Sequence, residues 1–426
     1  MSKKVVSITV FSIICVLILG ACNKTNEVTT STERADATDN KGSMVIAVMA
    51  PEFESSITNM FGVGYDIEVK SILPSVDDIA NHWNDLDVVI DDFIKNNKDV
   101  DIVYGFPTEY LKGLVDKGNI KKLNGSLDES LLESVAPAVM EPFKKAGNGD
   151  VYAITPYFNN YVLAYNKNIF NELGIEAPPN GMTWEDTSNL AKLIQEKSNY
   201  KGVTLGMPSS DEQFYYLYLT LSRPIFKPES NSGEIQVNTE LNSKYWTLFT
   251  DMYNDNEKAT MEEFVQGKVA MGVFPISQLT DEKMLNFYGD YEPSDWGLVE
   301  MPIFEENEGG LAFTDSLFVV SKYSDNKQVI KFLEYIQGKE YAIKMAENSL
   351  FPTYWSNEIK EIYSKKYGFD FSPAYNQPGE LIEQPKFNAA EFNGIQEAGE
   401  MYFVNVLTGT VNVQESLNDY QKEISQ

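Results

Sequence analysis

Short apolar segments alternate with helical segments along the N-terminal part of the chain. Residues 44–49 form an apolar run typical of a buried strand, and residues 100–104 form another. Between them, Ile67 and Val69 alternate with polar residues, and residues 83–94 have helical spacing. This alternation predicts an α/β fold on an open sheet, in which ligands bind beyond the carboxyl ends of the strands. The residues just past the strands are therefore candidates to face a ligand: Glu52, Phe53, Phe106 and Pro107.

The length of the chain predicts more than one compact unit. Once the N-terminal segment described below is set aside, about 400 of the 426 residues remain, too many for one hydrophobic core. No repeat of roughly 20 to 50 residues is evident, which disfavours a solenoid or a propeller. We therefore expect two lobes.

The N-terminus has the pattern of a secretion signal. Lys3 and Lys4 precede an apolar run over residues 5–19 that is too short to span a bilayer comfortably. The run ends in Leu19-Gly20-Ala21-Cys22, which resembles the lipobox of bacterial lipoproteins. This resemblance implies removal of residues 1–21 and lipidation of Cys22; an uncleaved anchor and an ordinary signal peptide are the alternatives. Residues 22–43 are polar or small and are expected to form a flexible tether on the outer face of the cell membrane of a bacterium with a single membrane.

Composition excludes several kinds of chemistry. The only cysteines are Cys15, within the signal, and Cys22, and the only histidine is His82. Cysteine proteases and thiolate or multi-histidine zinc sites are excluded, as is a Ser-His-Asp hydrolase unless His82 is its base. A formal charge of -29 makes nucleic acid and anionic membrane surfaces poor partners. With no complete nucleotide-binding or EF-hand motif, we expect no cofactor and no metal.

The middle of the chain carries the strongest motifs. Residues 149–170, GDVYAITPYFNNYVLAYNKNIF, precede residues 176–194, where Thr183 begins a capping box closed by Asp186, and Leu190, Leu193 and Ile194 are expected on one helical face. This pair of segments resembles the solute-binding proteins of ATP-driven sugar importers, the family that includes maltose-binding protein. Further similar segments follow in the family's order, at residues 266–276, 295–304, 316–336, 350–355 and 407–424. Residues 53–65 are shorter than the family pattern, and residues 223–236 align with nothing.

The resemblance implies a two-lobed periplasmic-binding-protein fold with three hinge crossings. These are expected near residues 154–156, 301–304 and 351–353. One lobe would contain residues 44–153 and 304–350, and the other residues 154–303 and 351–426. The protein would be a monomeric, non-enzymatic receptor that closes on its solute and delivers it to the permease of an ABC importer.

A carbohydrate is the expected ligand, because sugar rings stack on aromatic side chains while their hydroxyls need fixed polar partners. Asn159 and Asn160 are stronger candidates because they follow the first crossing and their side chains can both donate to and accept from hydroxyls. Arg223, the only arginine of the body, suits carboxylates or sugar hydroxyls. Phe274 occupies the position from which an aromatic often reaches the ligand in the family. The full set of candidates is Glu52, Phe53, Phe106, Tyr157, Asn159, Asn160, Asp211, Phe214, Arg223, Phe274, Thr314, Asp315 and Trp355.

Two other functions remain open at this point. A secreted glycoside hydrolase needs only two carboxylates, and the adjacent pairs are Asp91-Asp92, Glu262-Glu263 and Glu305-Glu306. Adjacent residues do not face one another on a helix or strand, so these pairs are better explained as solvated surface. The same fold can also serve as the receptor of a membrane sensor.

Overall fold

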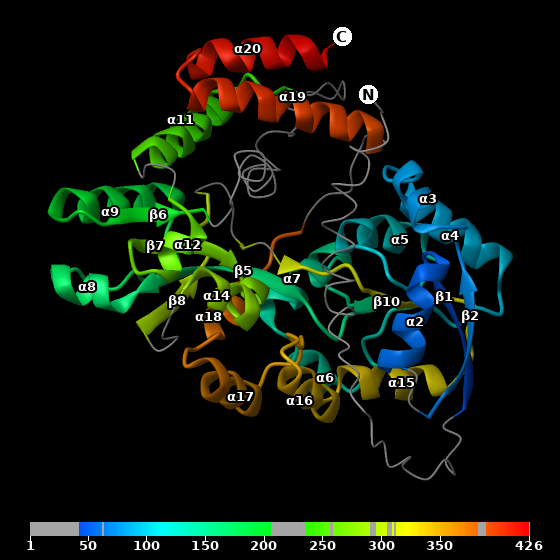
Figure 1. Ribbon diagram of the computed structural model, residues 1–426. Coiled ribbons are helices and arrows are strands. Elements are labelled where there is room, and N and C mark those ends of the chain that lie inside the picture. Colours follow the sequence, from blue (N-terminus) through cyan, green and yellow to red (C-terminus); the bar gives the residue numbers. More distant parts are fainter. Residues whose placement is uncertain are drawn as a thin grey trace.

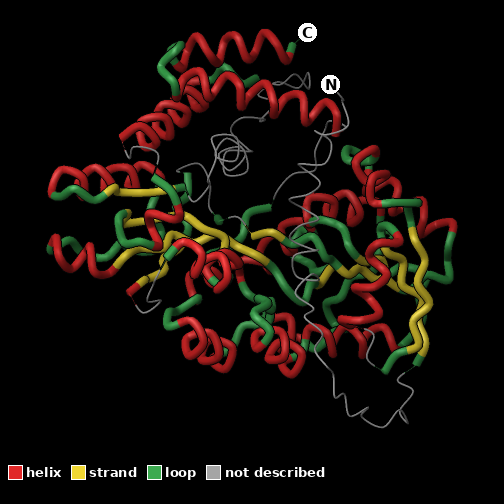
Figure 2. The backbone as a smooth tube through the Cα atoms, in the orientation of Figure 1, coloured by secondary structure: helices red, strands yellow, loops and turns green. Residues whose placement is uncertain are grey.

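The computed structural model describes residues 42–61, 64–205, 236–255, 259–289, 295–304, 309–310, 312–381 and 389–425. Within these ranges the chain forms two lobes, each built around a mixed β-sheet with helices packed against it (Figures 1 and 2). The α/β prediction is confirmed. None of the helices in this part of the chain is both long enough and apolar enough to cross a membrane.

The first sheet has the strand order β2-β1-β3-β10-β4. Its strands are β1 (Ser43–Val48), β2 (Asp66–Ser71), β3 (Ile102–Tyr104), β4 (Ala153–Ile154) and β10 (Phe318–Val320). Strand β1 pairs in parallel with β2 and β3, while β10 runs antiparallel to β3 and β4. The carboxyl ends of β1, β3 and β4 and the start of β10 therefore share one edge of the sheet.

The helices of this first lobe pack around that sheet (Figure 1). They are α2 (Glu54–Ser56), α3 (Val76–Asn81), α4 (Leu86–Asn96), α5 (Leu111–Lys117), α6 (Glu129–Glu133), α7 (Pro137–Ala146), α15 (Gln328–Gln337) and α16 (Lys339–Glu347), with short turns at Pro51–Phe53, Ile57–Phe61 and Thr108–Tyr110. Helix α15 buries one apolar face, formed by Val329, Phe332, Leu333 and Ile336.

The second sheet has the order β6-β7-β5-β8, with β9 pairing at the start of β5. Its strands are β5 (Asn159–Asn166), β6 (Lys201–Thr204), β7 (Val269–Pro275), β8 (Trp296–Glu300) and β9 (Ala312–Phe313). The helices that follow are α8 (Lys167–Leu173), α9 (Trp184–Lys197), α11 (Glu240–Asp255), α12 (Met261–Val265), α13 (Ile276–Leu279), α14 (Glu282–Tyr288), α17 (Asn357–Tyr367), α18 (Ser372–Asn376), α19 (Ala389–Leu407) and α20 (Val413–Ile424). Helix α9 packs on β6, α11 packs on α9, and α19 and α20 pack on α11.

Helix α9 begins at the capping box predicted for it. The Thr183 hydroxyl accepts from the Asp186 amide, and the Asp186 side chain accepts from the Thr183 amide. The buried face, however, consists of Trp184, Thr187, Ser188, Ala191 and Ile194. Leu193 is 39% exposed, so its predicted place on the apolar face is wrong. The helical repeat continues from Trp184 and turns Leu193 outward.

Alternate residues of β5 divide the interior of the second lobe into two cores. Tyr161 and Leu163 point into one core with α9, α11 and α20. Val162 and Ala164 point to the opposite face of the sheet, into a core that continues through α17 and α18 to the first lobe. The two-residue period of a strand produces this division. The two lobes consequently share apolar packing near the crossings.

The first and third crossings lie side by side. The Phe158 amide donates to Phe351 O at 3.0 Å, and the Thr353 amide donates to Pro156 O at 2.9 Å. Two buried hydrogen bonds also join the crossings. Gln337 Nε2 donates to Thr353 Oγ1 at 2.7 Å, and the Thr353 hydroxyl donates to Thr155 O at 2.5 Å. Through Gln337 both crossings are tied to α15 of the first lobe.

The second crossing lies further along the chain than the sequence indicates. Residues 301–304 stay with the second lobe, because the Trp184 amide donates to Ile303 O at 3.1 Å and the Phe304 ring packs 4.3 Å from that of Tyr245. The chain changes sheets between β9, which pairs with β5, and β10. The boundary expected at residues 303 and 304 is corrected to the stretch 314–317.

Replacing Thr353 with valine is expected to destabilise the protein by about 2 kcal/mol. Valine keeps the shape of the side chain but leaves a buried amide hydrogen of Gln337 and a buried carbonyl of Thr155 without this partner. Urea unfolding of the chain from residue 22 to residue 426 with Cys22→Ser, called the mature Cys22→Ser chain below, measures the change. A loss below about 0.5 kcal/mol would show that water replaces the hydroxyl at no cost.

Candidate interlobe site

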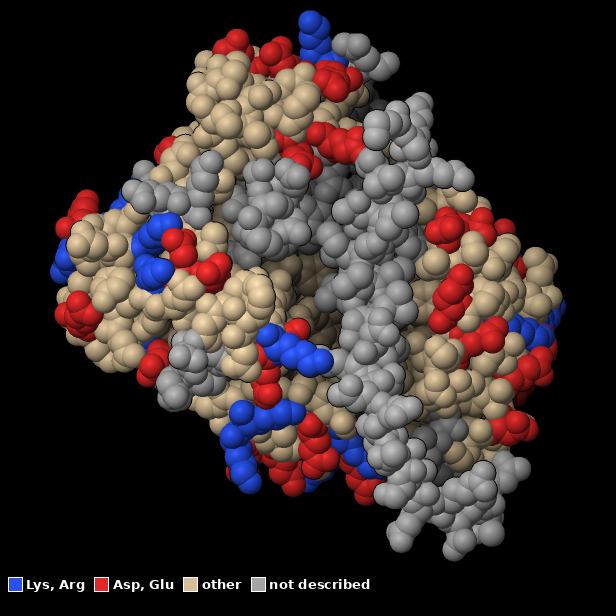
Figure 3. All heavy atoms as spheres, viewed as in Figure 1, with Lys and Arg blue, Asp and Glu red and all other residues tan. Residues whose placement is uncertain are grey.

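Polar residues gather where the strands of the first sheet end toward the second lobe. The Thr108 amide donates to Thr314 O at 3.1 Å, and the two threonine hydroxyls also hydrogen bond. These contacts bring the residues that follow, Glu109 and Asp315, to the same edge of the sheet. The face of the molecule drawn in Figure 3 is hollowed between the two lobes.

Tyr157 and Ser316 join the carboxyl groups in this cluster. The Tyr157 hydroxyl and Ser316 Oγ lie 2.7 Å apart, and Ser316 Oγ donates to Asp315 Oδ1 at 3.0 Å. Removal from water, together with the neighbouring Tyr104 and Asp315, raises the pKa of the Tyr157 hydroxyl far above its usual value. Tyr157 therefore stays neutral and can both donate and accept hydrogen bonds.

Both carboxyl groups resist ionisation. Removal from water raises the pKa of Glu109 to about 7, and repulsion from Asp315 adds to the rise. Burial also raises the pKa of Asp315, opposed by the hydrogen bond from Ser316. Glu109 can thus hold a proton under conditions in which exposed carboxyl groups are charged.

The raised pKa of Glu109 predicts how stability changes with pH. Its folded-state pKa lies above the usual 4.5, so charging it costs stability as the pH rises from 4.5 through about 7. Glu109→Gln, a neutral mimic, should match the wild-type protein near pH 4.5 and be more stable by about 2 kcal/mol at pH 8. Urea unfolding at a series of pH values tests this; an equal stability difference at every pH would contradict it.

On the second lobe, the start of β5 and the end of β7 form the edge of the sheet that faces the first lobe. Asn159 is partly buried there, and its Nδ2 donates to Ser277 Oγ at 3.0 Å. Asn160 is 1% exposed, and its Nδ2 donates to Ala374 O at 2.6 Å, so this side chain holds α18 in place. The ligand role predicted for Asn160 is corrected to a structural one.

Trp355 offers an aromatic surface beside the third crossing. Its amide donates to Ser134 O at 2.8 Å, and its ring is stacked on the buried Tyr375 with the centroids 3.7 Å apart and an angle of 16° between the planes. Tyr375 thus covers one face of the indole. Trp355 remains partly exposed, so part of the ring is available to a ligand.

Two predicted ligand aromatics are buried in the cores instead. Phe106 and Phe274 are both 0% exposed. The ring of Phe274 packs 5.0 Å from that of Phe264 and fills the space beside Gly272, where a Cβ atom would collide with it. Neither ring is available to a ligand, and the two predictions are corrected.

The remaining predicted residues occupy different surroundings. Glu52 is exposed just past β1, whereas Phe53 is 8% exposed and packs against Gly105, whose φ of +92° turns the chain at the end of β3. Thr314 is buried against Thr108. The other predicted residues, Cys22, Asp211, Phe214 and Arg223, lie outside the described residues.

Sequence reasoning missed three polar residues of this region. Glu109 and Ser316 belong to the hydroxyl and carboxyl cluster of the first lobe, and Ser277 bonds Asn159 in the second. Each lies within a few residues of a strand end, the same signal that led to Glu52 and Phe106. The signal covers several residues and does not indicate which of their side chains turn inward.

Comparison with known families identifies the chain. The family model described as bacterial extracellular solute-binding protein matches residues 61–356, more than half of the chain. The chain belongs to this family. Bacterial extracellular solute-binding proteins are transport receptors rather than enzymes, and the prediction of a non-enzymatic receptor is confirmed at this level.

Solved structures of solute-binding proteins have the same fold. A family 1 solute-binding protein from Alicyclobacillus acidocaldarius is 11% identical with a TM-score of 0.59, covering 90% of this chain and 97% of that chain. A sugar transporter from Rhizobium etli, in an open conformation, is 16% identical with a TM-score of 0.58, covering 90% and 99%. The cyclic α-maltosyl-1,6-maltose binding protein from Arthrobacter globiformis is 15% identical with a TM-score of 0.54, covering 90% and 97%. These likenesses confirm the periplasmic-binding-protein fold.

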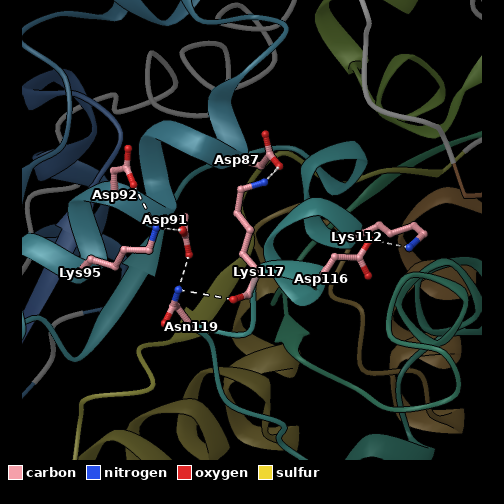
Figure 4. A network of polar contacts seen from close by, with 8 residues as sticks. All are labelled: Asp87, Asp91, Asp92, Lys95, Lys112, Asp116, Lys117 and Asn119. Carbon is pink, nitrogen blue, oxygen red and sulfur yellow. Dashed lines mark hydrogen bonds and ion pairs between the residues drawn. The ribbon is translucent and has the colours of Figure 1, made fainter.

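The acidic pairs that suggested a hydrolase have structural roles where the chain is described. Asp91 is 3% exposed, and Lys95 Nζ lies 2.6 Å from it and 3.1 Å from Asp92 (Figure 4). Glu263 closes the capping box of α12 with Thr260. Glu305 and Glu306 lie outside the described residues.

The only histidine of the chain contacts a neighbouring carboxylate. His82 Nδ1 lies 3.0 Å from Asp85 Oδ1 at the end of α3, with a partly exposed side chain. In the part of the chain that the structure describes, no three His, Cys, Asp or Glu side chains form a group suited to a metal ion.

Proposed function

We propose that this solute-binding protein is the receptor of an ABC importer and captures a carbohydrate between its two lobes. The observation that carries the proposal is the gathering of polar side chains at the edges of both sheets, with the partly exposed Trp355 beside the third crossing. Glu109, Asp315 and Tyr157 supply hydrogen-bonding groups on one side, and Asn159 supplies an amide on the other. Sugars need this combination, since ring faces stack on an aromatic ring and hydroxyls need fixed donors and acceptors.

Two structurally similar solute-binding proteins support a carbohydrate as the class of ligand. The Rhizobium etli neighbour is a sugar transporter, and the Arthrobacter globiformis neighbour binds cyclic α-maltosyl-1,6-maltose. At their low identities they support a carbohydrate ligand without naming one. The size and linkage of the sugar follow from the panel below.

Closure of the lobes would deliver the sugar. The ligand bridges the two edges, expels water, and shifts the population toward a closed form that the permease recognises. Lipid on Cys22 would hold the protein at the outer face of the membrane, with residues 22–43 as the tether. Mass spectrometry of the protein from its native membrane tests the anchor: acyl chains on Cys22 support it, and an unmodified or differently cleaved N-terminus rejects it.

Thermal unfolding of the mature Cys22→Ser chain against a panel of mono- and oligosaccharides tests the ligand class. A sugar at 100 times its dissociation constant should add about 2.7 kcal/mol of stability and raise the unfolding temperature. Chromatography of each sample must show the sugar intact. A panel without any shift would reject a carbohydrate ligand, and breakdown of the sugar would establish a hydrolase.

A further inference from the structure

Among the residues that the structure describes, no positively charged group acts on the carboxyl pair of the first lobe. Among the described residues, the groups that act on Glu109 are its own backbone and Asp315. Asp315 is influenced by Ser316 and by its own backbone. Ion pairs elsewhere on this lobe join lysines to other acids, as Lys117 to Asp87 and Lys122 to Asp150. Two like charges in a partly buried site without a base are costly.

The groups packed around the pair are neutral hydroxyls. Tyr157, from the first crossing, reaches Asp315 through Ser316, and Tyr104 lies close enough to Tyr157 to raise its pKa. Tyr110, beside Glu109, donates its hydroxyl to Trp83 O at 2.5 Å and is held neutral by burial, which raises its pKa. Thr108 and Thr314 bond each other. None of these groups can neutralise a second carboxylate.

Because Asp315 lies in one crossing and is joined through Ser316 to Tyr157 beside another, lobe closure would change the exposure of the pair to water. Asp315 belongs to the stretch 314–317 that returns to the first sheet, and Tyr157 follows the first crossing. Loss of water disfavours the charged forms further, and a neutral sugar supplies no compensating charge. A carboxylic acid beside a carboxylate also offers both a donor and acceptors, which matches a sugar hydroxyl.

We propose that Glu109 and Asp315 determine specificity in the interlobe site by taking up a proton as the lobes close on a neutral sugar, and by rejecting anionic sugars. This inference rests on the proposed function. Its consequence is that affinity for a neutral sugar increases as the pH falls, by at most about tenfold per pH unit for one linked proton. An acidic sugar would place a third negative charge beside the pair and bind more weakly.

Calorimetric titration of the mature Cys22→Ser chain tests the linkage. Maltotriose, or the neutral saccharide that gives the largest thermal shift, is titrated at pH 6, 7 and 8 in buffers of different ionisation enthalpy. We expect net proton uptake at pH 7 and 8 and about 10-fold tighter binding at pH 6 than at pH 8. Glu109→Gln should abolish the uptake and flatten the pH dependence. Glu196→Gln, which alters an exposed acid of α9, should leave both unchanged.

Two outcomes would overturn the inference while leaving the proposed function intact. Binding without proton uptake is one, and binding of trigalacturonate as tightly as maltotriose is the other. A ligand-free measurement keeps the test independent of the sugar. The carboxyl ¹³C signals should include a group titrating near neutral pH that is lost in Glu109→Gln, and its absence would also overturn the inference. A protein that binds no saccharide but shows this titration would fail the proposed function alone.

Discussion

Replacing Trp355 with alanine is expected to weaken sugar binding by about 30-fold. The indole is fixed by its stack on Tyr375, so it offers a rigid face and loses little conformational freedom when a sugar packs on it. Removing a buried aromatic anchor of this kind typically costs about 2 kcal/mol of binding free energy. Calorimetric titration with the best saccharide of the thermal panel measures the change.

Phe287→Ala provides the matched control. Phe287 lies on α14 and is 85% exposed, so its loss should change neither affinity nor fold. Far-ultraviolet circular dichroism and the unfolding temperature of Trp355→Ala separate lost binding from lost structure. A folded Trp355→Ala variant with wild-type affinity would remove Trp355 from the site.

Replacing Lys117 with methionine is expected to lower the free energy of unfolding by about 3 kcal/mol. Lys117 Nζ at the end of α5 is paired with Asp87 of α4, and Asp87 is 4% exposed (Figure 4). Helix α5 approaches so closely at Gly113 that a Cβ atom there would collide with Asp87. Methionine keeps the length of the side chain and removes the positive charge that is paired with a buried carboxylate, which is the costly way to break a buried ion pair.

A second pair on the same helix supplies the control. Lys112 Nζ lies 2.7 Å from Asp116 Oδ2, with side chains 49% and 55% exposed, and Figure 4 shows this pair on α5 as well. Exposed pairs of this kind contribute less than about 1 kcal/mol, so Lys112→Met should be almost neutral. Urea unfolding of both variants measures the difference. Equal effects would mean that burial of Asp87 does not set the stability of the α4 and α5 contact.

The sequence predicted the elements that depend on local patterns. The apolar runs at residues 44–49 and 100–104 correspond to β1 and β3, and the capping box at Thr183 and Asp186 starts α9. Short-range hydrogen bonds and the local pattern of apolar residues determine these features, so they can be predicted without tertiary information. The order of the motifs along the chain predicted the family, and the family in turn predicted the two-lobed fold.

The features that sequence reasoning missed depend on long-range contacts. Whether Phe274 turns to the cleft or to the core depends on Gly272 and on Phe264 of the preceding helix α12, not on its position after an apolar strand. The second crossing lies later in the chain than predicted because β9 pairs with β5 before the chain returns to the first sheet. Glu109 became a candidate only when the bond between Thr108 and Thr314 placed it beside Asp315. Tertiary contacts that no local sequence pattern specifies decided each of these cases.

The bond network around Thr353 indicates how the lobes would move. The first and third crossings are tied to each other and to α15, so they are expected to move with the first lobe as one body. Bending would then fall on the residues that follow, near Asn159 and the stretch 314–317. The carboxyl pair and Trp355 lie beside these bends, where closure changes their surroundings most.

A distance measurement between the lobes tests the central claim most directly. A chain of residues 22–426 with Cys22→Ser has no cysteine, so spin labels can be attached selectively at Val88→Cys on α4 and Leu193→Cys on α9, which are 42% and 39% exposed. Double electron–electron resonance should show the distance distribution shift to shorter values when a saccharide that stabilises the protein is added. A sugar that binds and leaves the distribution unchanged would contradict capture between closing lobes.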